Sequence, residues 1–301
     1  MNRNEIEKYL EERMKESGIS SPTLEDINKF MGEWIQQKNH RSRDDFEGFS
    51  ATGMGLILHH LLQADCPVQL ADYTDLDCSL VPLFRQLKLL LNLLEKEGSF
   101  KLTQTGNLPV RVVKAIYDVG LPSSNVESGI ISIRSENDST SVQMTHIAAQ
   151  ISRLSKKQNN KLSLTKKGKD LLSNDSLLLT ELLTVMLTQF NTAYFDNDSS
   201  ENIGNIGKGF SLILLDKYGE IDRPYTFYSD KYFQAFPKLL EEITERYMPR
   251  EKMAALCYLF RIFGVLFENL GLISYQKGAF FETIIHRHDI FEKLFIFKYP
   301  Y

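Results

Sequence analysis

The sequence contains little cysteine, and its three cysteines lie far apart. Cys66, Cys78 and Cys257 are odd in number and form no C-x-x-C pair, so they predict neither a disulfide framework nor a thiolate zinc site. Long apolar runs are also missing: residues 258–267, for example, are interrupted by Arg261 and fall short of the roughly 20 residues that a membrane helix needs. The N-terminus is charged and lacks the apolar core of a secretion signal. We therefore expect a cytoplasmic protein without a membrane span.

Catalytic and metal-binding signatures are absent from the sequence as well. It contains no G-x-S-x-G, H-E-x-x-H or dinucleotide-binding fingerprint. The glycine-rich residues 204–210 differ from a phosphate-binding loop, which would need glycine at Asn202 and serine or threonine at Gly209. The histidines at 59–60 and 286–288 are one or two positions apart, whereas two metal ligands on a helix usually lie four apart. We expect no catalytic residues, no cofactor and no metal.

The composition is that of an ordinary globular protein. Of the 301 residues, 43% are hydrophobic and 25% are charged. Because a typical domain has about 100–150 residues, two or three compact units are expected. The formal net charge of −4 does not favour the whole molecule as a nucleic-acid binder, since neutralisation of phosphates drives that affinity. The local distribution of charge must therefore indicate whether one part of the chain binds nucleic acid.

Two segments share the pattern Leu-Thr-x-x-Gly, which starts at Leu102 and again at Leu164. In both places an amphipathic helix and a short strand-like stretch come before the pattern, and a helix follows it. The leucine is expected to pack in the core, and Thr103 or Thr165 is expected to cap the next helix by accepting a backbone N–H. The glycine lets that helix lie close to the strand. The pattern predicts the strand-to-helix joint of a winged-helix-like unit.

The expected fold class is mainly α with short β wings, and tandem winged-helix-like units are flanked by helical N- and C-terminal parts. Apolar spacing predicts a helical N-terminal element at 1–45, a first winged-helix-like unit at 46–120 and a second at 121–200. Residues 201–301 are expected to form a helical C-terminal unit with a degenerate third wing. There Thr283 is expected to cap a last helix at 284–297.

Five segments carry a resemblance to a known family. They are FEGFS at 46–50, KLTQTGNLP at 101–109, KLSLTKKG at 161–168, NTAYFD at 191–196 and GFSLILL at 209–215. In these segments the chain resembles an uncharacterised bacterial family of the Bacteroidetes type, with tandem winged-helix-like LTxxG repeats. Some related sequences occur beside SEC-C or plasmid ORF-3-like modules. The resemblance covers most of residues 46–301 and implies a shared architecture, but no activity and no catalytic residue.

The strongest local charge lies around the second wing. Seven basic residues lie in this stretch, and Asp170 is its one acidic residue. The basic residues are Arg153, Lys156, Lys157, Lys161, Lys166, Lys167 and Lys169. Near the first wing, Lys101, Arg111 and Lys114 occur with no acidic residue between positions 100 and 117. A winged helix that binds DNA often places a basic wing on the phosphates, so these ten residues form the candidate nucleic-acid-binding set. The alternative is a solvated, lysine-rich surface turn.

A dense aromatic cluster precedes the C-terminal helices, and it consists of Tyr225, Phe227, Tyr228, Tyr232, Phe233 and Phe236. Tyrosine and phenylalanine are favoured at the centres of protein interfaces, but aromatic residues at helical spacing are more often core. Three functions are therefore open. The first is non-enzymatic binding of DNA through the second wing. The second is a protein-interaction or assembly module, favoured by the acidic total and the aromatic residues. The third is an enzyme with an unrecognised site.

Overall fold

A computed structural model describes residues 3–122, 124–130, 132–196, 198–245, 247–276 and 283–300. The chain is mainly helical and carries a few short antiparallel strands, which confirms the predicted fold class at that level. Within the described ranges, no helix has both the length and the apolar character needed to cross a membrane.

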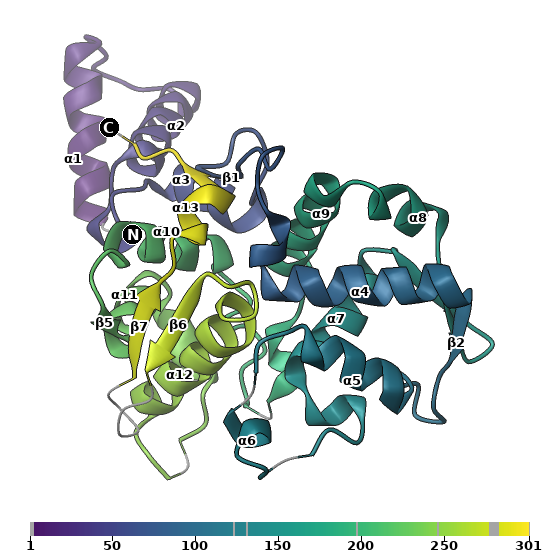
Figure 1. The fold of residues 1–301 in the computed structure, drawn as a ribbon. Coiled ribbons are helices and arrows are strands. Elements are labelled where there is room, and N and C mark those ends of the chain that lie inside the picture. The colour runs from purple at the N-terminus through teal and green to yellow at the C-terminus, as the bar shows by residue number, and fades with distance from the viewer. Residues whose placement is uncertain are drawn as a thin grey trace.

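The elements are arranged as shown in Figure 1. The described α-helices are α1 (Arg3–Glu16), α2 (Leu24–His40), α3 (Ala51–His59), α4 (Pro82–Glu97), α5 (Val110–Asp118), α6 (Ser124–Glu127), α7 (Thr140–Ile151), α8 (Lys166–Leu172), α9 (Asp175–Thr188), α10 (Lys208–Tyr218), α11 (Tyr225–Ala235), α12 (Arg250–Tyr258) and α13 (Ile290–Leu294). Helix α12 continues directly into a π-helix, Leu259–Phe267. The described strands are β1 (Val68–Leu70), β2 (Ser99–Lys101), β3 (Ser155–Gln158), β4 (Lys161–Leu164), β5 (Arg223–Pro224), β6 (Ile273–Gln276), β7 (Ile284–Arg287) and β8 (Phe295–Phe297).

The N-terminal helices α1 and α2 form a hairpin at one end of the molecule (Figure 1). A capping box begins α2, because the Thr23 hydroxyl accepts the Asp26 N–H and the Asp26 carboxylate accepts the Thr23 N–H. Helix α2 buries Phe30 and Trp34, whereas α1 buries no side chain. The Ser50 hydroxyl caps α3 in turn.

Unit A comprises residues 82–164. Its elements follow one another as helix α4, strand β2, helices α5 and α7, and the hairpin β3–β4. Strand β2 pairs with β4, which pairs with β3, so the antiparallel sheet has the order β2-β4-β3. This is the arrangement of a winged helix, in which the first strand joins the hairpin that forms the wing. Helix α4 lies at the centre of the core and buries five leucines at helical spacing, Leu83, Leu87, Leu90, Leu91 and Leu94.

Unit B comprises residues 208–287 and has the same order of elements. Helix α10 leads to β5, then to α11 and to α12 with its π-helix, and finally to β6 and β7. The sheet order, β5-β7-β6, matches that of unit A position by position. Residues 277–282 lie outside the described residues, and the centre of the predicted third wing falls on them.

The aromatic cluster of unit B belongs to the core. Tyr225, Tyr228 and Tyr232 are at most 1% exposed. The ring of Tyr232 stacks on that of Tyr258 from α12, with the centroids 4.3 Å apart. These contacts hold α11 against α12, so these tyrosines provide packing.

The predicted division into wings at 46–120 and 121–200 is corrected by the strand pairing. Phe100 of β2 lies opposite Leu162 of β4, so the strands that precede the two Leu-Thr-x-x-Gly segments belong to one sheet, that of unit A. A lone three-residue strand leaves its backbone groups unpaired, and β2 satisfies them with a hairpin about sixty residues away. The second unit with this topology is unit B, inside the range predicted as the helical C-terminal unit.

The two Leu-Thr-x-x-Gly segments also have different local structures. Thr165 caps α8 by accepting the Gly168 N–H at 3.0 Å, as predicted. Thr103 caps no helix: it closes a turn in which Gly106 has a φ of +88°, and α5 begins later, after Pro109. The predicted helix at 284–297 is wrong as well. That range holds β7, the short helix α13 and β8, because its first residues pair with β6.

The two units are joined by segments that precede unit A and follow unit B. Strand β1 pairs with β8, so the chain before α4 contacts the C-terminal end. The Tyr73 hydroxyl donates to the Leu294 carbonyl at 2.7 Å in the same region. Helix α3 packs on α10 at Gly209, where a Cβ atom would lie 3.0 Å from Ile57. Residues 204–210 are therefore a close helix contact, which agrees with the rejection of a phosphate loop.

Candidate nucleic-acid interface

The sheet of unit A gathers several of the predicted basic residues on one face. Lys101 of β2 lies directly opposite Lys161 of β4, and Lys156 of β3 lies opposite Ser163. Side chains alternate along a strand and partners share a face, so these three lysines point away from the row of Phe100 and Leu162, which is buried. We call Lys101, Lys156 and Lys161 the wing lysines.

The turn of the wing is rigidly built. Asn159 and Asn160 have φ values of 51° and 55°, as a two-residue type I′ hairpin requires, and asparagine tolerates this conformation. Asn160 also ties the wing to the end of β2, since its side-chain amide donates to the Leu102 carbonyl at 3.0 Å and the Leu102 N–H donates back to the Asn160 carbonyl. Lys157 reaches over a different turn, at residues 103–107, and its Nζ lies 2.6 Å from where a Cβ atom on Gly106 would be.

The remaining predicted residues separate into two groups. Arg153, Lys114, Lys166 and Lys169 are exposed on the elements around the sheet, and no carboxylate among the described residues pairs with them or with the wing lysines. Arg153 has a φ of 58° in the turn before β3. These side chains are available to an anionic ligand.

Arg111 and Lys167 are already paired. The Arg111 guanidinium binds Glu97 in a two-point ion pair that lowers the pKa of that carboxyl, and it lies over the Phe100 ring. Lys167 donates to Glu181 at 2.6 Å and to the Ser152 carbonyl at 3.0 Å, where it caps the end of α7. Since these contacts hold α5 to α4 and α8 to α9, both residues have structural roles that the sequence did not reveal.

Helix α7 occupies the place of the base-reading helix of a helix-turn-helix protein, but its surface does not suit that role. Only Thr140 is exposed, while Gln143, Ile147, Gln150 and Ile151 are half-buried and the rest of the helix is buried. The helix contains no arginine or lysine. Base reading needs several side chains that reach the base edges, so α7 offers little direct readout.

A buried polar cluster stabilises α7. Glu136 and His146 are both about 5% exposed, and the His146 Nδ1 lies 2.8 Å from a Glu136 carboxylate oxygen. The other oxygen of Glu136 accepts the Leu108 N–H at 2.6 Å. Because this cluster connects the start of α5 to α7, it fixes the angle between the two helices.

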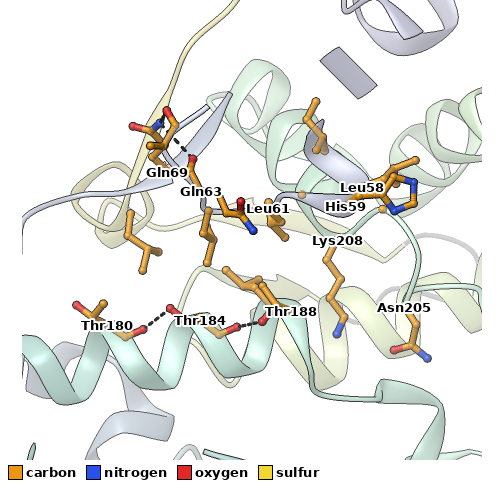
Figure 2. Close-up of a pocket in the computed structure, with 17 residues that line it drawn as sticks. Leu58, His59, Leu61, Gln63, Gln69, Thr180, Thr184, Thr188, Asn205 and Lys208 are labelled. Atoms are coloured by element: carbon orange, nitrogen blue, oxygen red, sulfur yellow. Dashed lines mark hydrogen bonds between the residues drawn. The ribbon is translucent and has the colours of Figure 1, made fainter. Parts of the chain in front are cut away.

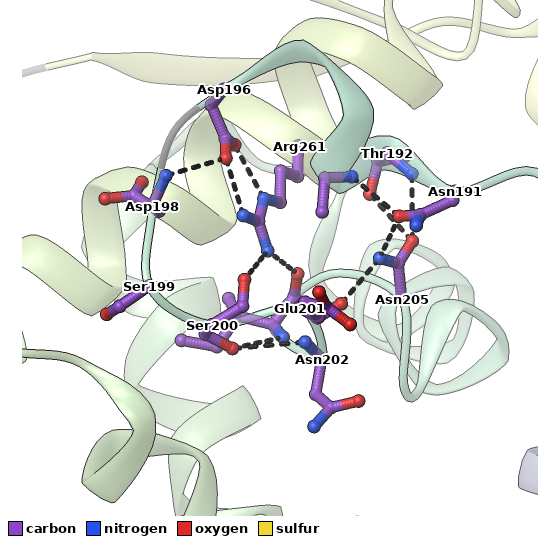
Figure 3. Close-up of polar contacts among 12 residues, drawn as sticks. Asn191, Thr192, Asp196, Asp198, Ser199, Ser200, Glu201, Asn202, Asn205 and Arg261 are labelled. Carbon is purple, nitrogen blue, oxygen red and sulfur yellow. Dashed lines mark hydrogen bonds and ion pairs between the residues drawn. The ribbon is translucent and has the colours of Figure 1, made fainter.

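The corresponding helix of unit B is buried for most of its length beyond the first turn. A fully buried arginine in it organises the loop that leads into the unit. The guanidinium of Arg261, in the π-helix, binds both oxygens of Asp196 at 2.6 Å (Figure 3). It also donates to the Ser200 and Ile203 carbonyls at 2.8 and 2.9 Å. Gly204, with a φ of +77°, leaves space for this contact, since a Cβ atom there would lie 2.9 Å from the arginine Cβ.

Asp196 and Asp198 of this loop form, together with Cys257 of α12, one group of potential metal ligands among the described residues. Both oxygens of Asp196 are engaged by Arg261. Burial raises the pKa of the Cys257 thiol. Asp196 of this group therefore serves the buried ion pair.

Comparison with known families concerns unit A. Residues 79–177 match the family model described as the Y4jL N-terminal domain. This range covers unit A together with α8 and the first residues of α9. No curated protein and no solved structure matches the chain. Unit A is thus similar to the Y4jL N-terminal domain over less than half of the whole chain.

Proposed function

We propose that this protein binds the phosphate backbone of nucleic acid through the wing lysines. The observation that carries the proposal is the placement of Lys101 directly opposite Lys161, with Lys156 on the same face. Like charges that face each other across a strand pair destabilise it. A polyanion relieves this repulsion and releases counterions as it binds. The cytoplasm suits this function, since all three cysteines are free, buried thiols.

The binding should not depend on base sequence. Helix α7 is mostly buried and carries no cation, so phosphate contacts from the wing dominate. For three neutralised phosphates the slope of log K against log salt is about −2.7, which predicts about a 40-fold loss of affinity between 50 and 200 mM salt.

The test is a mobility shift with a labelled DNA duplex at 50 mM salt. The variant Lys101→Ala, Lys156→Ala, Lys161→Ala should lose the shifted band. The control Lys29→Ala, Lys238→Ala changes two exposed lysines far from the sheet and should keep it. No shift with the wild-type protein, or an equal loss in both variants, would reject the proposal.

A second candidate function, assembly with another protein chain, is favoured by the α1–α2 hairpin. Leu24 and Ile35 of α2 are 76% and 42% exposed, and they lie eleven positions apart, so they share a helix face. Light scattering across concentration tests self-assembly: Leu24→Ser with Ile35→Ser should reduce the mass of any oligomer to that of one chain. A wild-type protein that stays monomeric removes this candidate.

A further inference from the structure

A cleft of about 700 Å³ lies next to the start of unit B, away from the wing. Three parts of the chain enclose it: the end of α3 with the following loop and β1, the second half of α9, and the start of α10 (Figure 2). Small-molecule sites typically have volumes of about 300–1,000 Å³. The cleft therefore has the size of a ligand site.

The walls of the cleft combine an apolar surface with a row of hydroxyls. Leucines line it from α3, the following loop and β1, among them Leu58, Leu61 and Leu70. On the opposite wall, Thr180 and Thr184 lie on one face of α9 together with Thr188 (Figure 2). Each threonine hydroxyl donates to the carbonyl one turn earlier, at 2.6–2.8 Å, so its oxygen can still accept a hydrogen bond.

Lys208 places a cation in the wall of this cleft. Its side chain is 4% exposed, and its Nζ donates to the Phe190 carbonyl and, at 3.3 Å, to the Met186 carbonyl. An ammonium has three N–H donors, and among the described residues no third acceptor and no carboxylate meets this one. Burial lowers the pKa of Lys208 to about 8, which is the effect of an uncompensated charge.

The backbone next to Lys208 adds to the positive potential. Lys208 is the first residue of α10, and the preceding Gly207 has no side chain to cap the helix. The first N–H groups of α10 have no side-chain acceptor there, and the helix dipole is positive at this end. Both Gly207 and Gly209 line the cleft beside the ammonium.

We propose that the cleft binds a small organic carboxylate with an apolar body. The carboxylate accepts the remaining Lys208 N–H, and the apolar body covers the leucines. A single ammonium with one remaining donor suits a monoanion, whereas a phosphate dianion needs several donors. This site does not include the wing lysines. A negative result for the cleft would therefore leave the proposed binding of nucleic acid unaffected.

Two ligands with equal chains test the proposal by isothermal titration calorimetry on the full chain at pH 7. Octanoate carries the carboxylate, and 1-octanol is its neutral counterpart. We expect octanoate to bind the wild-type protein at least tenfold more tightly than octanol. Lys208→Met, which removes the charge and keeps the volume, should abolish this preference. The control Lys238→Met, at an exposed position, should retain it.

A second variant protects the test against misfolding, because Lys208 also satisfies two backbone carbonyls. Thr184→Phe leaves the lysine intact and fills the cleft, so it should weaken both ligands at least tenfold. Absence of octanoate binding to the wild type, equal affinities of the two ligands, or octanoate affinity unchanged by Thr184→Phe would each overturn the proposal.

Discussion

The opposed pair Lys101 and Lys161 allows one substitution to change stability and binding in opposite directions. In Lys161→Glu, a repulsive cross-strand pair becomes an attractive one, with the two Cβ atoms about 5 Å apart. Such pairs are worth about 0.2–1 kcal/mol each, and both residues are exposed. We therefore expect the free energy of unfolding to rise by about 0.5–1 kcal/mol at low salt.

The same substitution should weaken nucleic-acid binding. It removes one phosphate contact and places a carboxylate on the central strand of the sheet. We expect at least a tenfold loss of affinity for a DNA duplex, measured by fluorescence anisotropy, next to a urea unfolding curve of the same preparation. Lys238→Glu is the control, because this exposed lysine has no cross-strand partner.

The double variant Lys101→Glu, Lys161→Glu sharpens the prediction. It restores a like-charge pair, so stability should return to about the wild-type value while affinity falls further. The reasoning is refuted if Lys161→Glu is less stable than the wild type, or if it binds DNA as well as Lys238→Glu does.

Three further predictions concern the interior. Arg261→Met leaves a buried carboxylate without its partner and should lower the free energy of unfolding in urea by about 3–5 kcal/mol; a loss below about 1 kcal/mol would contradict the role of the buried pair. Gly168→Ala places a Cβ atom 2.2 Å from the Leu154 carbonyl oxygen and should lower the free energy of unfolding by about 1–3 kcal/mol. The control Gly55→Ala, at a helix position with open space, should leave the free energy of unfolding unchanged or raise it by up to about 1 kcal/mol. The pKa of Lys208 falls from 10.5 to about 8 on folding, so the unfolded chain holds more protons between these values and stability rises with pH there. Relative to Lys208→Met, the wild type should gain about 3 kcal/mol between pH 7.5 and 10.5, and parallel pH profiles would contradict this.

Local signals in the sequence were sufficient for the parts of the fold that depend on neighbouring residues. The cap at Thr165 was predicted because its side chain accepts the N–H three residues later. Helical apolar spacing also predicted α4 and the buried aromatic residues of α11. These features need no knowledge of which elements meet in space.

Features set by tertiary pairing were missed. The pairing of β2 with β4 joins segments about sixty residues apart, and no periodicity reveals it. The ion pairs of Arg111 and Lys167 each span fourteen residues and arise only when their helices pack together. Strand β7 was predicted as helix because four residues are too few to show a period.

The candidate site was foreseen in composition but not in geometry. The sequence located the basic residues, yet it could not show that three of them share a face or that α7 is buried. Arg261 was noted only as an interruption of an apolar run. A lone charge in such a run is rarely buried without a partner, and this signal could have predicted the pair with Asp196.

The salt dependence of DNA binding tests the central claim most directly. Anisotropy titrations between 50 and 200 mM salt should give a slope of log K against log salt of about −2.7 for the wild type. The slope should approach zero for the variant Lys101→Ala, Lys156→Ala, Lys161→Ala, and it should be unchanged for Lys29→Ala, Lys238→Ala. Equal slopes for all three proteins would contradict the assignment of the wing lysines.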